Sequence, residues 1–179
     1  MIQPTLTTDR LSLRPFVRSD GVDVQRLAGD KRIADVTANI PHPYPDGLAE
    51  EWIARHHANW DAGKSASFAI TRSDDGTLLG AISIMNIADG SAEIGYWLGV
   101  DAWGAGYATE ACSEIVRFAT EDMQLRQLKA SVLARNPASG RVLTKAGLQH
   151  VGQIQGDCGH HLGELIELYE KDSAGSETV

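Results

Sequence analysis

Apolar and polar residues alternate along this chain with two periods, one typical of strands and the other typical of helices. The alternation over 10–14 predicts a half-buried strand, and Ser19 or Asp20 can cap a helix that follows it. A second helix is expected from Asp46 to about Trp60, where apolar residues recur at helical spacing. The remaining predicted elements are strands over 67–71, 78–85 and 92–98, a helix over 107–119, a strand over 128–133, a helix over 137–145, and strands over 148–154 and 162–169.

The order of these elements predicts an α+β domain whose sheet has helices on both faces. Turn signals at 73–76 and at Asp89-Gly90 indicate that the three middle strands form a meander. The helix after residue 106 carries Glu110 and Glu114 on its polar side, and its apolar face comprises Ala108, Ala111, Cys112, Ile115 and Ala119.

Length and charge limit the class of protein. At 179 residues the chain has room for one well-formed domain, expected over 1–172, with 173–179 as a disordered tail. The net charge of −8 argues against a protein that binds nucleic acid or anionic membranes through a broad basic face. The longest run without a charged residue has 13 members, too few to cross a membrane. A plain N-terminus and two cysteines lead us to expect a cytoplasmic protein.

A glycine-rich loop over 99–106 stands between a predicted strand and a predicted helix. Gly104 and Gly106 allow the backbone to approach a ligand closely, and the amides that open the helix suit a pyrophosphate. The loop contains no Gly-Lys-Ser or Gly-Lys-Thr, and the one Gly-Lys-Ser of the chain, at 63–65, has Ala58 where a Walker loop has its first glycine, which excludes a Walker loop. Thr109 stands where a dinucleotide fingerprint has its third glycine, and no acidic residue follows in the next strand, which argues against NAD. Coenzyme A is the remaining candidate.

Four separated motifs closely resemble the GNAT superfamily of acetyl-CoA-dependent N-acetyltransferases, and most of all the branch that acetylates N-terminal amines of ribosomal proteins. The resemblance extends from about Thr8 to Tyr169. It implies a mostly antiparallel, mixed sheet of about six to seven strands flanked by about four helices. The motifs, in chain order, are 94–98 (Ile-Gly-Tyr-Trp-Leu), 103–111 (Trp-Gly-Ala-Gly-Tyr-Ala-Thr-Glu-Ala), 136–139 (Asn-Pro-Ala-Ser) and 145–148 (Lys-Ala-Gly-Leu), and the opening segment 8–15 is also similar to that branch.

The resemblance implies a coenzyme site on the glycine-rich loop. Backbone amides from Gly104 to Ala108 would hold the pyrophosphate, and the strand before the loop would splay from its neighbour so that the pantetheine arm pairs with backbone near 98–100. Trp103 departs from the superfamily pattern, which has Arg or Gln there, so one side-chain contact is lost. The expected coenzyme-binding residues are Leu98, Gly99, Val100, Trp103, Gly104, Ala105, Gly106, Tyr107, Ala108, Asn136 and Ser139.

Transfer of an acetyl group to an amine needs a base, because an ammonium must first lose its proton. Glu93 is the first candidate: it lies on the strand leading to the loop and matches a position where some family members carry a catalytic glutamate. It can also be read as an ordinary solvent-facing carboxylate. Asp157 is the weaker candidate, since a loop aspartate is usually a turn residue.

The leaving thiolate needs a hydrogen-bond donor or an acid. Ser139 lies in the first turn of a predicted helix, whose positive end favours negative charge, and the resembled branch uses a serine at this place. Asn136 can cap this helix and also contact the coenzyme. Positive charge near the site comes from Arg135, Arg141 and Lys145, which either meet the coenzyme phosphates or form a solvated helix face.

No metal is expected. His56-His57 is an adjacent helical pair that points to different faces, and Cys158-Gly159-His160-His161 lacks flanking ligands at a suitable spacing. Cys112 is expected to pack in the core rather than act as a nucleophile. Trp52, Trp60 and Tyr44 are read first as core residues, while the loop over 41–45 lies where the family shapes its acceptor channel.

The predicted function is transfer of an acetyl group from acetyl-CoA to a primary amine, either a protein N-terminus or a small molecule, by a monomer or homodimer. The net charge agrees with cationic acceptors such as basic N-termini, aminoglycosides or polyamines. The alternative is a catalytically idle module that binds acyl-CoA and senses it or docks a partner. Both use the loop over 104–108, so coenzyme release in the presence of an amine separates them.

Overall fold

The computed structural model describes residues 2–156 and 162–173. Eight strands form one sheet in the order β1-β2-β3-β4-β5-β6-β8-β7. All neighbours pair antiparallel except β5 and β6, which are parallel. The strands are β1 Leu6–Thr7, β2 Leu11–Pro15, β3 Ala66–Arg72, β4 Leu78–Ala88, β5 Ser91–Leu98, β6 Gln127–Leu133, β7 Gln149–Gln155 and β8 Leu165–Asp172.

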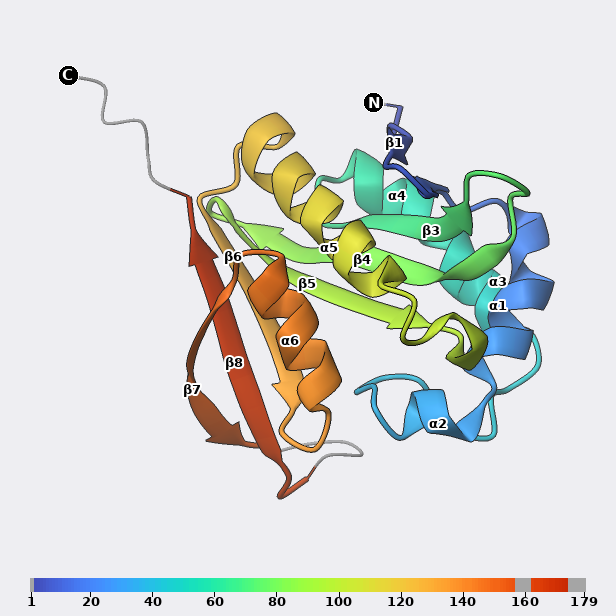
Figure 1. The fold of residues 1–179 in the computed structure, drawn as a ribbon. Helices are drawn as coiled ribbons and strands as arrows, with labels where there is room; N and C mark the ends of the chain where they lie inside the picture. Colours follow the sequence, from blue (N-terminus) through green and yellow to red (C-terminus); the bar gives the residue numbers. More distant parts are fainter. Residues whose placement is uncertain (1, 157–161, 174–179) are drawn as a thin grey trace.

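Helices cover both faces of the sheet (Figure 1). On one face α5 packs against β2, β4 and β5, and α6 packs against β6, β7 and β8; on the other, α1 packs against β4 and α4 against β3. None of the described helices is long and apolar enough to cross a membrane. The helices are α1 Gly21–Ala28, α2 Lys31–Ala34, α3 Leu48–Ala54, α4 His56–Asp61, α5 Tyr107–Arg117 and α6 Pro137–Lys145.

The sheet separates two hydrophobic clusters because side chains alternate between its faces. The larger cluster lies under α5 and α6 and contains Phe68, Ile82, Ile115 and Leu128, all essentially without solvent exposure. The smaller cluster lies under α1 and α3 and is formed by Val24, Ala49, Ile53, Ala69 and Leu78. The sheet lies between the two clusters, so a site within the sheet has one of its two faces on each side.

β5 and β6 part after a short contact. Their register joins only Ser91, Ala92 and Glu93 to the three residues that begin β6. β5 continues to Leu98 and β6 to Leu133, so among the described residues no strand pairs with that edge of β5 beyond Glu93. The splay implied by the family resemblance is therefore present in the structure.

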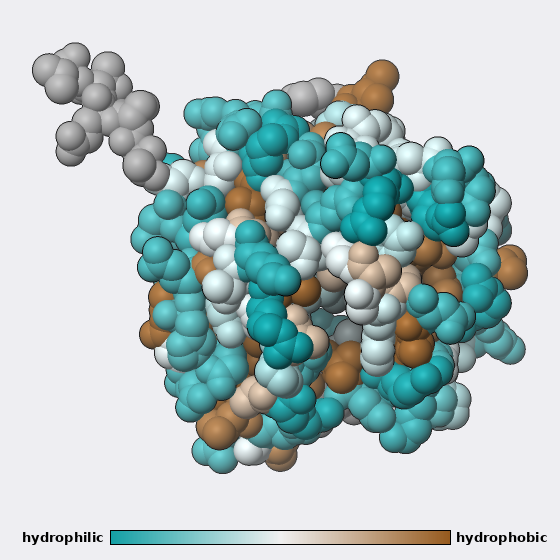
Figure 2. All heavy atoms as spheres, viewed as in Figure 1, coloured by the Kyte–Doolittle hydropathy of each residue, from teal (hydrophilic) through white to brown (hydrophobic). Residues whose placement is uncertain are grey.

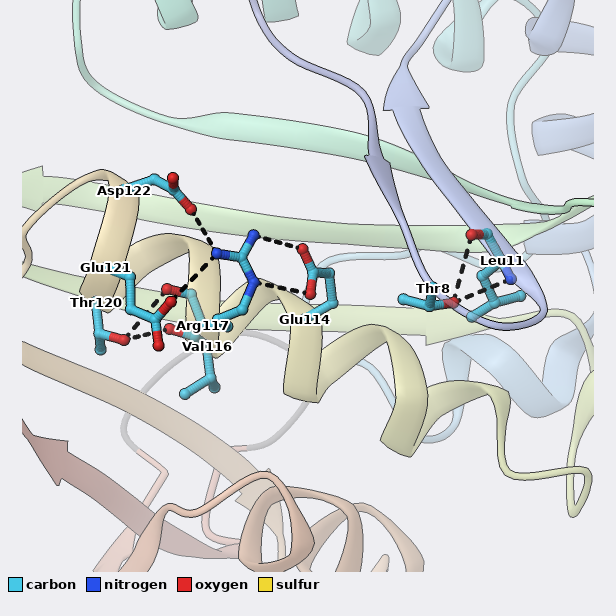
Figure 3. Close-up of polar contacts among 8 residues, drawn as sticks. All are labelled: Thr8, Leu11, Glu114, Val116, Arg117, Thr120, Glu121 and Asp122. Atoms are coloured by element: carbon cyan, nitrogen blue, oxygen red, sulfur yellow. Dashed lines mark hydrogen bonds and ion pairs between the residues drawn. The ribbon is translucent and has the colours of Figure 1, made fainter.

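Polar contacts hold the C-terminal end of α5 and the turn before β2 (Figure 3). Arg117 at the end of α5 donates to Glu114, to Glu121 and, at 2.8 Å, to Asp122, and so ties the helix to the π-helical turn Phe118–Asp122. In the N-terminal turn the Thr8 hydroxyl accepts from the Leu11 N–H at 3.0 Å.

The sequence predictions of fold class and of most elements are confirmed, but α2 was not predicted and other elements differ in number, division or bounds. The sheet has one strand more than the six to seven expected, since the two-residue β1 carries too short a pattern to detect. The expected helix over 46–60 is divided at Arg55 into α3 and α4. The last strand begins at Leu165 and ends at Asp172, three residues later than predicted at each end.

Asp20 does not cap α1 with its side chain, contrary to the sequence prediction. Its carboxylate instead accepts two hydrogen bonds from the Arg14 guanidinium, both 2.8 Å, and one from the Val17 N–H at 2.9 Å. Burial acts to raise the pKa of Asp20, but these hydrogen bonds and the Arg14 charge outweigh it and leave the pKa below its usual range. The bidentate pair fixes the chain between β2 and α1.

Replacing Asp20 with alanine is expected to lower the free energy of unfolding by about 3 kcal/mol, because it leaves the Arg14 guanidinium without its partner. Urea denaturation at pH 7 measures the loss. The control is Asp23→Ala, which breaks an exposed pair with Arg26 and should cost less than about 1 kcal/mol.

The pH dependence gives a second check on Asp20. Its folded pKa lies below its unfolded pKa of about 4, so its stabilisation is present above about pH 4 and is lost as the pH falls through the folded pKa. The difference between the native protein and Asp20→Ala should therefore shrink on acidification. A difference that stays constant from pH 7 to below pH 3 would contradict this role.

Candidate active site

A cavity of about 810 Å³ lies where β5 and β6 diverge. Both strands line it, β5 over 93–97 and β6 over 130–133, and so do Asn136 and Ser139 at the start of α6. It continues to the side covered by α1, α3 and α4, where Trp52 and His56 contribute to its wall. Figure 2 shows the surface hollowed near the centre of the view, between α6 and the segments around α2. One cavity thus joins the two faces of the sheet through the gap between the strands.

The glycine-rich loop ends at the start of α5. Gly106 is the N-cap residue and has φ of +84°, and Gly104 has φ of +75°, so both adopt the left-handed conformation that glycine favours. The first amides of α5 have no acceptor within the helix, and together with the helix dipole they favour an anion. Tyr107 and Ala108 are the first two residues of this helix, as the sequence predicts.

Arg10 braces this loop from the N-terminal segment. Its guanidinium donates to the Ala105 carbonyl at 3.0 Å and to Glu110 at 2.7 Å, and it lies 4.6 Å from the centre of the Tyr107 ring. Glu110 also accepts from the Thr8 hydroxyl at 2.6 Å and from the Arg10 N–H at 2.8 Å. Burial acts to raise the pKa of Glu110, but these hydrogen bonds outweigh it and the pKa is lowered. Sequence reasoning placed Glu110 correctly on the polar side of α5 but missed the brace.

Trp103 reaches back across the loop to the end of β5. Its indole N–H donates to the Leu98 carbonyl at 2.8 Å, while 45% of the residue stays exposed. The Gly99 N–H donates to Leu79, and the carbonyls of Gly99 and Val100 accept from the turn that follows. Much of the backbone over 98–100 therefore has internal partners, and the edge of β5 that faces the gap lies just before it.

Tyr96 and Ser139 meet across the cavity. The Tyr96 hydroxyl and the Ser139 Oγ are 2.8 Å apart, which joins β5 to the first turn of α6. Burial raises the pKa of Tyr96 to about 12, although the hydrogen bond with Ser139 acts in the opposite direction. Tyr96 is therefore protonated at neutral pH. It lies within the quoted motif over 94–98, but a motif alone does not show which of its residues touches the site.

Asn136 caps α6 as predicted. Its side-chain oxygen accepts from the Ser139 N–H at 3.3 Å, and Pro137 occupies the first helical position. Asn136 also lines the cavity, so the capping role and a coenzyme contact are compatible in this geometry.

Glu93 lies at the point where β5 leaves β6. Its carboxylate is exposed, lines the cavity and accepts a hydrogen bond from the Asn86 side chain at 3.0 Å. Alternation along β5 puts Glu93 and Trp97 on the face of α1 and α3, and Tyr96 on the face of α5 and α6. Because of this alternation, Glu93 and the Tyr96–Ser139 pair occupy opposite sides of the gap. Three residues along a strand span about 10 Å. Asp157, the other candidate base, lies outside the described residues.

The three predicted cations near α6 differ in their surroundings. Arg135 is paired with Glu164 at 2.6 Å. Arg141 and Lys145 line a smaller cavity of about 390 Å³ beside α6, together with Asn136 and Thr144. Of the three, these two remain candidates for contact with phosphates.

In the part of the chain that the structure describes, no group of three or more His, Cys, Asp or Glu side chains is arranged so that it could hold a metal ion. His56 is buried, its ring packs edge-to-face against Trp52 at 4.3 Å, and burial lowers its pKa to about 4. His57 lies 3.3 Å from Asp61 on the outside of α4.

Cys112 packs in the core, where burial raises the pKa of its thiol to about 12, which confirms the packing role. The segment 158–161 lies outside the described residues.

Comparison with known families identifies the chain. The model of the acetyltransferase (GNAT) domain matches residues 10–149, more than three quarters of the sequence. The chain belongs to the GNAT family. It is therefore an acetyl-CoA-dependent N-acetyltransferase, and the match begins at Arg10, the residue that braces the glycine-rich loop.

Relatives of this GNAT protein agree in fold over nearly their whole length. An uncharacterized N-acetyltransferase of Bacillus licheniformis, p20, is 27% identical over 168 residues, which are 92% of this chain and 93% of p20. The solved structure of RimL, a ribosomal alpha-N-protein acetyltransferase in complex with coenzyme A, superimposes with a TM-score of 0.85 at 15% identity, covering 94% of this chain and 98% of RimL. The ribosomal-protein-S5-alanine acetyltransferase of Vibrio fischeri has a TM-score of 0.84 at 17% identity and covers 97% and 98% of the two chains.

Gly106→Ala in this GNAT protein is expected to raise the Kd for acetyl-CoA about tenfold or more, because a side chain there obstructs the close approach of the backbone to a phosphate. Positive φ also costs an alanine about 1–2 kcal/mol of stability. Calorimetry on chelator-treated protein measures binding, which a site made of backbone amides should retain without metal.

Gly47→Ala is the matched control for Gly106→Ala. Gly47 is the N-cap of α3 and has φ of +80°, so the strain is similar, but no atom lies within 4 Å of an added Cβ and the position is remote from the loop. The control should lose similar stability and keep its affinity for acetyl-CoA. Equal losses of affinity in both variants would assign Gly106 a structural role only.

Proposed function

We propose that this protein transfers the acetyl group of acetyl-CoA directly to a primary amine inside the cavity between β5 and β6. The observation that carries the proposal is the continuity of that cavity through the sheet. The edge of β5 without a neighbouring strand and the start of α6 lie beside it on one face, and an open wall of α1, α3 and α4 residues lies on the other. Two substrates can therefore approach one point from opposite faces.

The coenzyme is assigned to the α5–α6 face. The amides at the start of α5 would hold the pyrophosphate, with Gly104 and Gly106 allowing its close approach. The pantetheine arm would follow the free edge of β5 in the gap and bring the thioester beside Tyr96 and Ser139. RimL, which shares the fold, is in complex with coenzyme A, and this supports the assignment.

The amine would enter from the face of α1 and α3 and lose its proton to Glu93, directly or through a water. Its nitrogen then forms a bond to the thioester carbonyl carbon, the carbon–sulfur bond breaks, and a second proton passes from the nitrogen to the departing sulfur, which gives the amide and the free thiol. The departing sulfur takes up negative charge near the start of α6, whose dipole favours it. Either hydroxyl of the Tyr96–Ser139 pair can be the donor. In this scheme Tyr96 would donate to the Ser139 Oγ, which would leave the Ser139 hydrogen free to point at the sulfur.

Either a protein N-terminus or a small amine could serve as the acceptor in this scheme. Neighbours in fold space include acetyltransferases of ribosomal proteins, which supports the first class. The alternative of an idle acyl-CoA-binding module predicts coenzyme binding without thiol release. The presence of Glu93, Tyr96 and Ser139 along one cavity favours catalysis.

Glu93→Gln is expected to lower kcat by about 10²-fold or more with little change in acetyl-CoA affinity, because glutamine keeps the shape but cannot accept the proton. Thiol release in the presence of an accepting amine measures the rate. The loss should shrink at high pH, where more of the amine is already neutral.

Glu51→Gln is the control for the loss of a negative charge, since Glu51 is exposed on α3 and does not line the cavity. An unchanged rate in Glu93→Gln would move the role of base to another group. Absence of thiol release from the native protein with every class of amine would favour the idle module and overturn the proposed function.

Tyr96→Phe and Ser139→Ala should each lower kcat by about tenfold, and by a similar factor at every pH up to about 10, because both remove a donor to the leaving sulfur rather than a proton acceptor. A double variant that is no slower than the Ser139→Ala single variant would show that Tyr96 acts through Ser139. Fully additive losses in the double variant would contradict that arrangement.

A further inference from the structure

The charge of the acceptor side of the cavity differs in sign from that of the whole protein. The chain has a net charge of −8, but the charged residues that line the cavity, among those described, are Arg55, Lys64 and Glu93. His56 adds no charge, since burial lowers its pKa to about 4. The local balance is thus two cations against one carboxylate.

Neither cation is neutralised by the described residues. Arg55 and Lys64 have exposed side chains and form no ion pair with any described residue, whereas Arg10, Arg14, Arg72 and Arg117 are each held by carboxylates. Burial is the main cause of the lowered pKa of His56, and the charge of Arg55 is the second cause. The Arg55 guanidinium therefore lies near the wall of the cavity to which His56 contributes. Two unpaired cations at the mouth of an amine site favour an anionic group on the ligand.

These cations lie on the same side of the molecule as the candidate base. The Asn59 N–H donates to the Arg55 carbonyl at 3.0 Å, the Lys64 N–H donates to Asn59 at 2.9 Å, and the Ile87 N–H donates to Lys64 at 3.1 Å. Ile87 follows Asn86, whose side chain donates to Glu93. Arg55, Lys64 and Glu93 therefore follow one another along a continuous rim.

The wall inside this rim is aromatic and apolar. Tyr44, Trp52 and Trp97 line it, with Val24 and Leu48 beside them. Trp52 is fixed by edge-to-face contacts with Phe16 at 5.0 Å and with His56 at 4.3 Å, so its orientation is set before a ligand enters. Such a wall suits a flat or apolar body of modest size.

We propose that the acceptor is a small amine that also bears a carboxylate and an apolar or aromatic body, as an aromatic amino acid does. The carboxylate would pair with Arg55 or Lys64, the body would pack on Trp52, and the amine would face Glu93. A polyamine or an aminoglycoside would instead bring several positive charges to a rim that already has two cations and one carboxylate. This inference rests on the proposed function, because it names the acceptor of that same site.

The test compares acceptors that differ in one charge, by thiol release from acetyl-CoA. L-phenylalanine should exceed L-phenylalaninamide in kcat/KM by about tenfold or more, and both should exceed spermidine. Arg55→Gln and Lys64→Gln should reduce the ratio of the first two acceptors, mainly through KM, and added salt should do the same. Arg18→Gln, which removes an exposed cation outside the cavity, should leave the ratio unchanged.

Three results would overturn the inference while leaving the proposed function intact: spermidine as the best acceptor, equal rates with the acid and its amide, or a peptide N-terminus preferred over L-phenylalanine. The last result would assign the site to proteins. Acetyl-CoA binding by calorimetry without thiol release for any of these amines would overturn the proposed function itself, and the two failures are therefore distinguishable.

Discussion

Three register pairs join β5 to β6, and beyond Glu93 the parallel ladder between these strands ends. A sheet normally satisfies its backbone groups by pairing every interior strand on both edges. Here the edge of β5 is left open in the middle of the sheet rather than at its border, and the larger hydrophobic cluster, which takes residues from both halves of the sheet, keeps these halves in place. The cavity, the proposed approach of a ligand along β5 and the meeting of two faces at one point all depend on this early separation.

Separation of the strands also determines how the reactive groups are distributed. Alternation along β5 gives Glu93 to one face and Tyr96 to the other, while the gap lets both reach the same cavity. Glu93 stays exposed, whereas burial raises the pKa of the Tyr96 phenol and keeps it protonated, so the candidate proton acceptor and the candidate donor lie on opposite sides of the gap.

Much of this arrangement could be predicted from the sequence, because its signals are local. Asn136 followed by proline predicts the start of α6, and Gly104 and Gly106 predict the turn into α5. The end of pairing between β5 and β6 was only implied by the family resemblance, since the apolar pattern continues past it. The contact of Tyr96 with Ser139 and the brace from Arg10 could not be predicted, because each joins residues 43 or more positions apart through side chains. The division between α3 and α4 at Arg55 also escaped, since apolar residues recur at helical spacing on both sides of it.

The contact between Arg10 and Glu110 spans 100 residues of sequence. Closing so long a loop costs chain entropy, which is recovered only when the intervening sheet has formed. The glycine-rich loop therefore gains its last support late in folding, after the N-terminal strand has docked beside β3 and α5 has packed against it. During synthesis the first ten residues must wait for more than half of the chain to emerge before they find their partner. The order of assembly thus couples the completion of the glycine-rich loop to the completion of the domain, so that a partly folded chain would lack the loop to which we assign the coenzyme pyrophosphate.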